Sequence, residues 1–227
     1  MTNKIRQLDK HSPLHEGVQG EIRRMIIDHR LAPGMRIIES PLSIQLGVSR
    51  TPVREALFKL EEEGFIKSDL ARGFTVNDLS AQEVKELYPI VWTLEGLALR
   101  LAKPQISKVV KELKSINQEF AKAIGDPEKT VSVDTRFHET ITNQCRNQHL
   151  IDQLVLLRQL IVRYEFAYMQ DENWSRESYD QHNEIIKAIV KEDLNRAVEL
   201  IEQNWRYGME QISAWLEWTQ AQEKRRR

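Results

Sequence analysis

The run from Gly47 to Leu57 constrains the fold of this chain more than any other part of its sequence. A short apolar segment at 40–46 ends at Gly47, and a second helix opens at Ser49 with Pro52 in its first turn. Serine is a favoured N-cap residue, and proline is tolerated in a first helical turn because its missing N–H needs no partner there. Two helices joined by a glycine turn predict a helix-turn-helix, whose second helix can enter the major groove of DNA.

The residues on either side extend this motif. Apolar residues recur at helical spacing from 14 to 30, and a short β-branched pair follows at Ile37-Ile38. After the second helix of the motif, 65–68 and 74–77 have the character of two strands joined by a turn. Three helices followed by a hairpin is the order of a winged helix-turn-helix, which we expect in residues 1–79.

The remainder of the chain is predicted to be helical throughout. Ser80 and Glu83 have the spacing of a capping box, which marks a helix start and a domain boundary. The expected helices lie at about 81–103, 105–123, 128–144, 148–169, 175–191 and 193–219. The fold class is therefore mainly α: an N-terminal winged helix-turn-helix, then an all-α helical bundle in residues 80–227.

Composition limits the possible partners. The first 79 residues hold 12 basic and 11 acidic residues, and the remainder holds 21 and 23, so neither part is a polycation. Any DNA-binding surface must come from a few arginines placed on one face. The single cysteine, Cys145, fits a reducing compartment, and no run approaches the roughly 20 apolar residues of a membrane span. We expect a cytoplasmic protein without a membrane partner.

Two groups of motifs resemble one known family. From Leu42 to Val76 the chain has GVSRTPVREAL, EEGFI and RGFTV, and later it has Asp134-x-x-Phe137-His138 and Ser178-x3-His182. In these motifs it is similar to the GntR family of bacterial transcription regulators, in the FadR-like branch with an all-helical C-terminal ligand-binding (FCD) domain. The resemblance implies a non-enzymatic, homodimeric DNA-binding regulator, in most cases a repressor, that a small carboxylate effector controls.

The candidate DNA-binding residues surround the start of the second motif helix and the wing. Arg50 and Arg54 are four residues apart, hence on one helix face, where guanidinium groups can pair with guanine O6 and N7. A lone Arg-x3-Arg is more often a solvated charged face, but the resemblance implies that both arginines contact the operator. The full candidate set is Ser49, Arg50, Thr51, Arg54, Arg72 and Gly73.

The candidate metal site begins with Asp134 and His138, which the i, i+4 spacing places on one helix face. Sequence spacing cannot bring His182 to them, and on residues alone a surface pair and a core histidine are the commoner meanings. The resemblance implies that an aspartate and three histidines bind a divalent metal, Zn, Ni or Mn, which holds the effector. Asn204 stands where the fourth ligand is expected, and its neutral amide oxygen should weaken metal binding.

The expected mechanism is a homodimer on a palindromic operator, with an effector in the helical domain shifting the equilibrium between two states. Two alternatives remain open at this point. The same Asp134, His138 and His182 could hold a metal that activates water, as in a metal-dependent hydrolase, although no motif supplies a general base. The winged helix could also serve an architectural or protein-binding role, without base-specific contacts.

Overall fold

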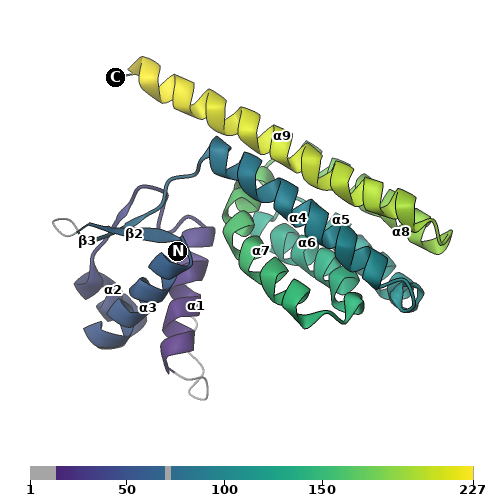
Figure 1. Cartoon of the computed structure of the whole chain (residues 1–227). Helices are drawn as coiled ribbons and strands as arrows, with labels where there is room; N and C mark the ends of the chain where they lie inside the picture. Colours follow the sequence, from purple (N-terminus) through teal and green to yellow (C-terminus); the bar gives the residue numbers. More distant parts are fainter. Residues whose placement is uncertain (1–13, 70–72, 227) are drawn as a thin grey trace. The chain divides into compact units, whose positions relative to one another are not determined.

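The computed structural model describes residues 14–69 and 73–226, and the chain divides into two compact units, Met1–Asp78 and Leu79–Arg227. Helices dominate both units, and a small sheet is confined to the first (Figure 1). The mainly α fold class predicted from the sequence is confirmed. No helix within the described ranges is long and apolar enough to cross a membrane.

The described residues of the first unit, 14–69 and 73–78, form three helices and a three-stranded antiparallel sheet with strand order β1-β3-β2. Its elements are α1 (Leu14–Ile27), β1 (Arg36–Ile37), α2 (Glu39–Leu46), α3 (Arg50–Glu62), β2 (Ile66–Asp69) and β3 (Gly73–Val76). In the sheet register, Phe74 of β3 lies opposite Ile37 of β1 and Ser68 of β2. The apolar face of α3 packs on α1, which buries Val53, Leu57 and Leu60.

The turn of the helix-turn-helix has the predicted glycine, but the two serines expected to cap its helices make no capping hydrogen bond. Gly47 is the C-cap of α2 with φ of 67°, a left-handed conformation in which glycine avoids a Cβ clash. The second helix starts at Glu39, one residue earlier than the expected Ser40. Ser49 is the N-cap of α3, yet its side chain makes no capping hydrogen bond. Its hydroxyl is therefore available to another partner.

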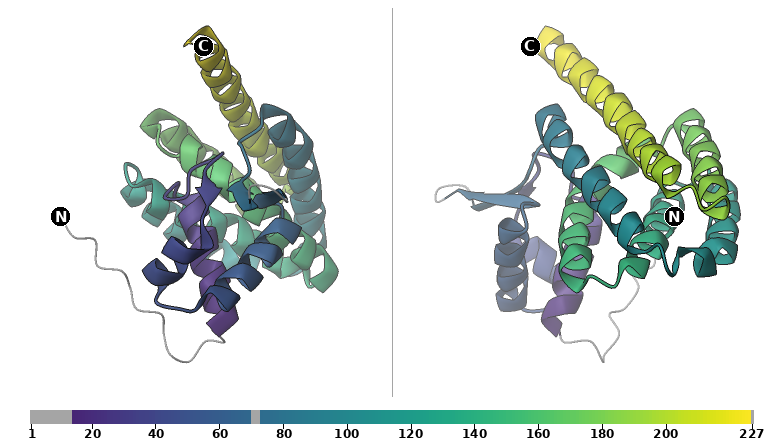
Figure 2. Two further views of the ribbon diagram at one scale, coloured as in Figure 1. Left: turned by 90° about the vertical axis from the view of Figure 1, so that its left-hand side faces the viewer. Right: turned by 45° about the vertical axis from the view of Figure 1, so that its right-hand side comes forward.

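The second unit is all helical, as Figure 2 shows from two further directions. Its elements are α4 (Ala81–Leu101), η1 (Ile106–Val109), α5 (Val110–Ala123), α6 (Pro127–Thr142), η2 (Asn143–Cys145), α7 (Gln148–Tyr168), α8 (Glu172–Val190) and α9 (Leu194–Arg226). The helix expected at 105–123 is divided into η1 and α5, and two other boundaries differ from expectation by three residues or more. Asp171 accepts hydrogen bonds from the N–H groups of Asn173 and Trp174, so α8 begins three residues early, and α9 continues seven residues beyond 219.

Helix α4 is central to this bundle, because it packs along α9 and also contacts α6 and α7. Its inward face buries Val84, Tyr88, Val91 and Leu99. One carboxylate, Glu95, interrupts this apolar face and is only 1% exposed. A buried charge is costly unless it is paired. Glu95 must therefore have polar partners, and these mark a polar site inside the apolar core.

The predicted capping box at the start of α4 is only half formed. Ser80 Oγ accepts from the Glu83 N–H at 3.3 Å, as a cap should. The Glu83 carboxylate does not return to the Ser80 N–H; it binds Arg163 Nη2 at 2.5 Å and the Tyr164 hydroxyl. The Ser80 N–H donates instead to the Tyr164 hydroxyl at 3.2 Å. A charged partner on α7 thus replaces the local cap and ties the start of α4 to α7.

Candidate functional site

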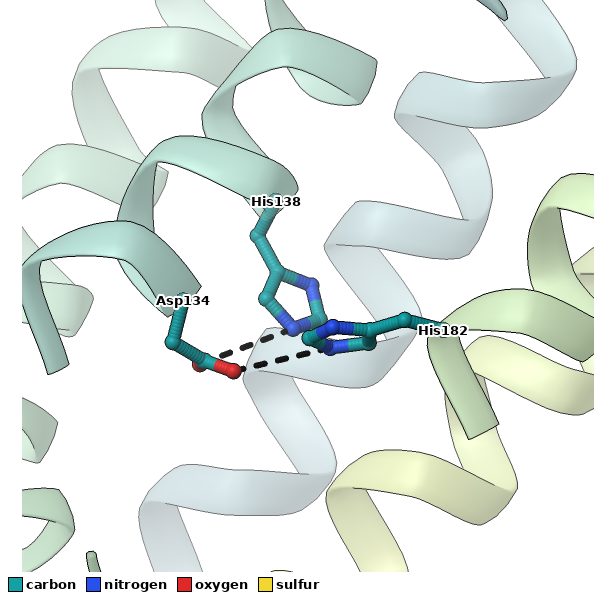
Figure 3. Close-up of side chains that lie close together, drawn as sticks. All are labelled: Asp134, His138 and His182. Carbon is teal, nitrogen blue, oxygen red and sulfur yellow. Dashed lines mark ion pairs between the residues drawn. The ribbon is translucent and has the colours of Figure 1, made fainter. Parts of the chain in front are cut away.

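Asp134, His138 and His182 meet in the interior of the helical unit (Figure 3). Asp134 and His138 point the same way from α6, as their spacing predicts, and α8 brings His182 across from the opposite side. Asp134 Oδ2 lies 3.8 Å from His138 Nε2, and Oδ1 lies 3.5 Å from His182 Nε2. The three ligand atoms lie within 4.8 Å of one another, and all three residues are buried. One metal ion could contact all of them.

A buried carboxylate fixes the tautomer of His138. Its Nδ1 lies 2.8 Å from Glu95 Oε2. An ionised carboxylate only accepts hydrogen bonds, so Nδ1 carries the proton and, in the neutral ring, Nε2 keeps its lone pair. This is the arrangement in which a second residue orients a metal-binding imidazole.

An amide fixes the tautomer of His182 in the same way. Asn117 Nδ2 donates to the Tyr179 carbonyl at 3.1 Å and to Asn183 Oδ1 at 3.0 Å, which turns Asn117 Oδ1 toward His182. His182 Nδ1 donates to that oxygen at 3.2 Å. His182 Nε2 is buried and has no hydrogen-bond partner among the described residues.

When both imidazoles are neutral and Asp134 is ionised, three acceptor atoms therefore converge with no donor between them. Two imidazole lone pairs and a carboxylate face one another in the dry interior, where an unsatisfied acceptor is costly. Histidine nitrogen and carboxylate oxygen are the donor set of Zn, Ni and Mn sites. The residues present thus fit a divalent cation, and the orphaned His182 Nε2 is the observation that shows this fit.

The sequence patterns did not identify Glu95 as part of this site, nor Asn117, Arg158 and Glu165. Glu95 accepts from His138, from Trp205 Nε1 at 2.8 Å and from the Arg158 guanidinium, with Arg158 Nε at 3.1 Å. Burial alone would raise its pKa, but His138 and Arg158 lower the pKa of Glu95 to about 2. A signal was present: Glu95 is the one acid in an apolar stretch of α4, and Arg158 is likewise a lone charge among leucines.

The charge balance of the site also favours a cation. Glu95, Asp134 and Glu165 are buried carboxyl groups, and Arg158 is the guanidinium that faces them. With neutral imidazoles and all three carboxyls ionised, this leaves two negative charges in excess. Without a cation, protons must compensate. Burial opposes the charged imidazole, but the Glu95 and Asp134 carboxylates outweigh it and raise the pKa of His138. Burial raises the pKa of Asp134 to about 6 and raises the pKa of Glu165, with the Asp134 charge adding to the latter. A divalent ion would supply the same compensation.

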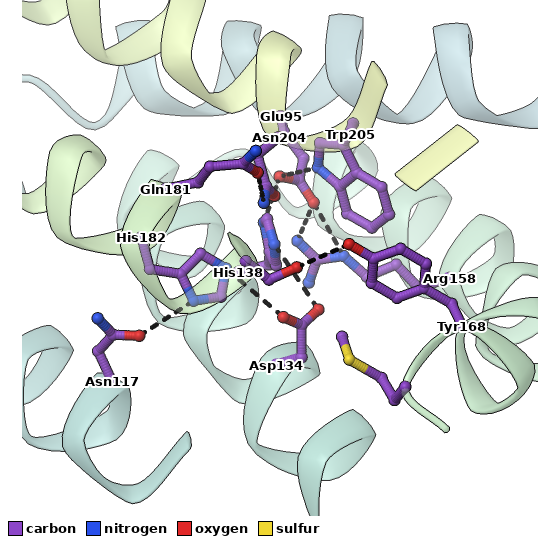
Figure 4. A network of polar contacts seen from close by, with 12 residues as sticks. Glu95, Asn117, Asp134, His138, Arg158, Tyr168, Gln181, His182, Asn204 and Trp205 are labelled. Atoms are coloured by element: carbon purple, nitrogen blue, oxygen red, sulfur yellow. Dashed lines mark hydrogen bonds and ion pairs between the residues drawn. The ribbon is translucent and has the colours of Figure 1, made fainter. Parts of the chain in front are cut away.

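A cavity of about 20 Å³ adjoins the triad. This volume is room for about one water molecule. Its wall includes Tyr88, whose buried hydroxyl has no hydrogen-bond partner in the described part of the chain, and Tyr168, whose hydroxyl bonds Ser178 Oγ at 3.1 Å. Figure 4 shows the polar network around Asp134, His138 and His182, with Tyr168 beside it. An organic ligand would therefore need wall side chains to move.

Asn204, the fourth candidate ligand, lies on the wall of this cavity together with Asp134 and His138. Its Nδ2 donates to Gln181 Oε1 at 2.8 Å, so the amide oxygen is the atom that this bond leaves free (Figure 4). An amide oxygen is a weak neutral ligand. The site therefore has three strong ligands and one weak candidate.

The DNA-reading candidates lie at the start of α3 in the first unit. Arg50 and Arg54 are 68% and 62% exposed, and with Thr51 they line a groove of about 510 Å³. Gly73 opens β3 with a left-handed φ of 74° and is exposed. Arg72 lies outside the described residues. Exposed guanidinium groups at a helix N-terminus suit phosphate and guanine contacts.

Each of the two units matches a known protein family. Residues 14–76 match the family described as bacterial regulatory proteins, gntR family, and residues 86–206, more than half of the chain, match the FCD domain. The chain belongs to the GntR family. It is a DNA-binding transcriptional regulator and not an enzyme, and its FCD domain implies a small-molecule effector. The metal-dependent hydrolase considered from the sequence is therefore wrong.

Relatives of this GntR regulator match over most of their length. It is 27% identical to an uncharacterized HTH-type transcriptional regulator, YdhC of Bacillus subtilis, over 93% of this chain and 96% of that protein. It is also 27% identical to the HTH-type transcriptional repressor RspR of Escherichia coli, over 82% of this chain and 83% of that protein. The solved structure of E. coli McbR/YncC has the same fold, with a TM-score of 0.79 at 22% identity, over 90% and 99% of the two chains.

Proposed function

We propose that this regulator represses transcription as a cytoplasmic homodimer bound to a palindromic operator, and that a small organic acid held on a divalent metal releases the DNA. Residues 1–79 are the DNA-binding domain, and 80–227 are the effector-binding and dimerisation domain. The convergence of Asp134, His138 and His182 on one point carries the proposal, because a metal bound there would make the helical domain responsive to a ligand. Repression is supported by the relative RspR, which is a transcriptional repressor.

The DNA-binding role of α3 is supported by its exposed N-terminus. Arg50 and Arg54 would read base edges, while Ser49 and Thr51 would donate to phosphate, and Arg72 and Gly73 would reach the DNA from the wing. The test is selection of bound duplexes from random DNA at stated salt. We expect an enriched inverted repeat. Duplexes without any shared sequence would contradict a sequence-specific repressor and favour the architectural alternative.

The effector is proposed to complete the metal coordination. Its carboxylate would take a position that the three protein ligands leave open, which is how zinc sites with three protein ligands bind substrates. The cavity of about 20 Å³ cannot hold an organic acid as it stands. The bound state must therefore differ from this one in its wall, and a ligand that favours one of two states shifts the population between them.

Replacing Asn204 with histidine should tighten metal binding. The imidazole would supply a fourth strong ligand on the cavity wall, where the amide oxygen is weak. We expect a lower dissociation constant for Zn²⁺ by competition with a chromophoric chelator, by about tenfold or more on the scale of such ligand changes. Gln203→His, one position away on α9, is the control. Equal affinities for Asn204→His and the unchanged protein would exclude Asn204 from the metal site.

The homodimer is supported by an apolar stripe on α4. Leu87, Ile90, Leu94, Leu97 and Leu101 recur at alternating spacings of three and four, which is the a/d pattern of a helix that packs on another helix. Ile90, Leu97 and Leu101 are 45–48% exposed. A stripe of this kind is self-complementary, as a two-fold symmetric contact between copies requires.

Replacing Leu97 with glutamate should therefore dissociate the dimer. A charge within the stripe would be buried without a partner, and sedimentation velocity should show monomers where the unchanged protein is dimeric. Val190→Glu is the control, because Val190 is 53% exposed at the end of α8 and outside the stripe. An unchanged dimer in Leu97→Glu would place the interface elsewhere.

A further inference from the structure

A carboxylate lies between the two arginines of the DNA-reading helix. Glu39 is the first residue of α2, and its side chain is 19% exposed, far less than the two arginines. Glu39 Oε2 lies 3.4 Å from Arg50 Nη2, and Oε1 lies 3.8 Å from Arg54 Nε. One carboxylate thus faces both guanidinium groups at once.

Arg54 is also restrained from a second side. Arg54 Cζ lies over the Phe58 ring at 5.9 Å from its centre, and Phe58 packs edge-on against Phe74 at 5.3 Å. Arg54 is therefore held by Glu39 on one side and by an aromatic pair on the other. Exposed ion pairs contribute little to the stability of a fold, so the value of this arrangement lies in where it directs the guanidinium groups.

A negative charge at this place is unfavourable for binding DNA as a polyanion. In a helix-turn-helix the first helix crosses the phosphate backbone, and α2 is that helix. The first 79 residues carry a net charge of only +1, so each carboxylate on this face removes a large part of the attraction to phosphate. Non-specific binding is mostly phosphate attraction, whereas guanine contacts depend on the direction of the arginine fork.

We propose that Glu39 is a specificity-determining residue, which directs Arg50 and Arg54 toward base edges and opposes their engagement with phosphate alone. This inference rests on the proposed sequence-specific DNA binding. Glu39 acts through the two arginines and is a positioning residue. It weakens binding to arbitrary DNA and strengthens binding to the operator, so its effect on the two kinds of DNA has opposite signs.

The test is Glu39→Gln in the full-length protein, measured by fluorescence anisotropy on the selected operator and on a scrambled duplex over a range of salt. We expect operator affinity to fall and scrambled-DNA affinity to rise, so that their ratio falls about tenfold or more. The salt dependence on scrambled DNA should steepen by about 0.9 for each additional phosphate that the variant neutralises. Thermal melting should be unchanged, which separates the effect from unfolding.

Glu62→Gln is the matched control, because Glu62 is exposed near the end of α3 and loses the same charge. It should tighten both duplexes by similar factors. If Glu39→Gln also tightens both duplexes by similar factors, the inference is overturned, and Glu39 affects DNA binding only through its negative charge. Removing both arginines should abolish the Glu39→Gln effect on the ratio; a persisting effect would also overturn it. An unchanged protein that does not distinguish the duplexes would instead contradict the proposed function itself.

Discussion

Replacing Asp134 with asparagine should stabilise the metal-free protein and abolish its stabilisation by metal. In the folded metal-free protein burial raises the pKa of Asp134 from 3.8 to about 6. The folded state then binds the proton more tightly than the unfolded state, so this contribution to stability is complete below about pH 4 and is lost as pH rises through 6. Above that pH the ionised carboxylate costs on the order of 3 kcal/mol.

The amide removes this cost and adds a donor. The Nε2 atoms of His138 and His182 both face position 134. The amide N–H of the Asp134→Asn variant can donate to one of them when that imidazole is neutral. By calorimetry with a chelator at pH 8, Asp134→Asn should melt at a higher temperature than the unchanged protein, and the difference should vanish near pH 4. Asp180→Asn, at an exposed position of α8, should change the melting temperature at neither pH.

With Zn²⁺ present the order should reverse. A ligand that binds only the folded state at one hundred times its dissociation constant stabilises by about 2.7 kcal/mol. Asp134→Asn lacks the charged ligand, so added Zn²⁺ should barely change its melting temperature while raising that of the unchanged protein. A variant that melts lower than the unchanged protein in chelator at pH 8 would show that Asp134 has a structural role that needs no metal.

Replacing Arg50 or Arg54 with alanine should each weaken operator binding by about 1–3 kcal/mol, which is roughly a five- to 150-fold loss. Both side chains are exposed at the start of α3 and within reach of one carboxylate, which shows that they can point together at one target. Because the DNA-binding unit is nearly neutral, few other contacts can replace them. Binding to the operator should be followed at fixed salt, since phosphate contacts depend strongly on it.

Substitution by lysine separates the contribution of guanine recognition from that of the positive charge. Lysine keeps the attraction to phosphate but lacks the planar fork that pairs bidentately with guanine. Arg50→Lys and Arg54→Lys should therefore lose operator affinity and keep affinity for scrambled DNA, whereas Lys111→Ala, an exposed charge on α5, should leave both unchanged. If the lysine variants bind the operator as well as the unchanged protein does, the arginines contact phosphate alone.

Local patterns were sufficient to predict the fold class and the Asp134–His138 pair of the candidate metal site. The glycine turn at Gly47 needs only a left-handed backbone, and the spacing of Asp134 and His138 needs only a helix; both are consequences of short-range geometry. The same locality explains the errors at helix ends. Ser80 and Glu83 have the spacing of a capping box, but Arg163 on another helix offers the Glu83 carboxylate a charged partner that sequence spacing could not reveal.

What the amino-acid sequence alone determined was therefore a winged helix-turn-helix with two arginines on one helix face, followed by a helical bundle. The tertiary structure decided the rest. Only packing of α4, α6 and α8 brings Glu95, Asp134, His138 and His182 together, and only the hydrogen bonds of Glu95 and Asn117 turn both Nε2 atoms toward one point. These contacts join residues 43 to 65 positions apart, Glu95 with His138 and Asn117 with His182. Periodicity describes one helix at a time and carries no information about which helices meet.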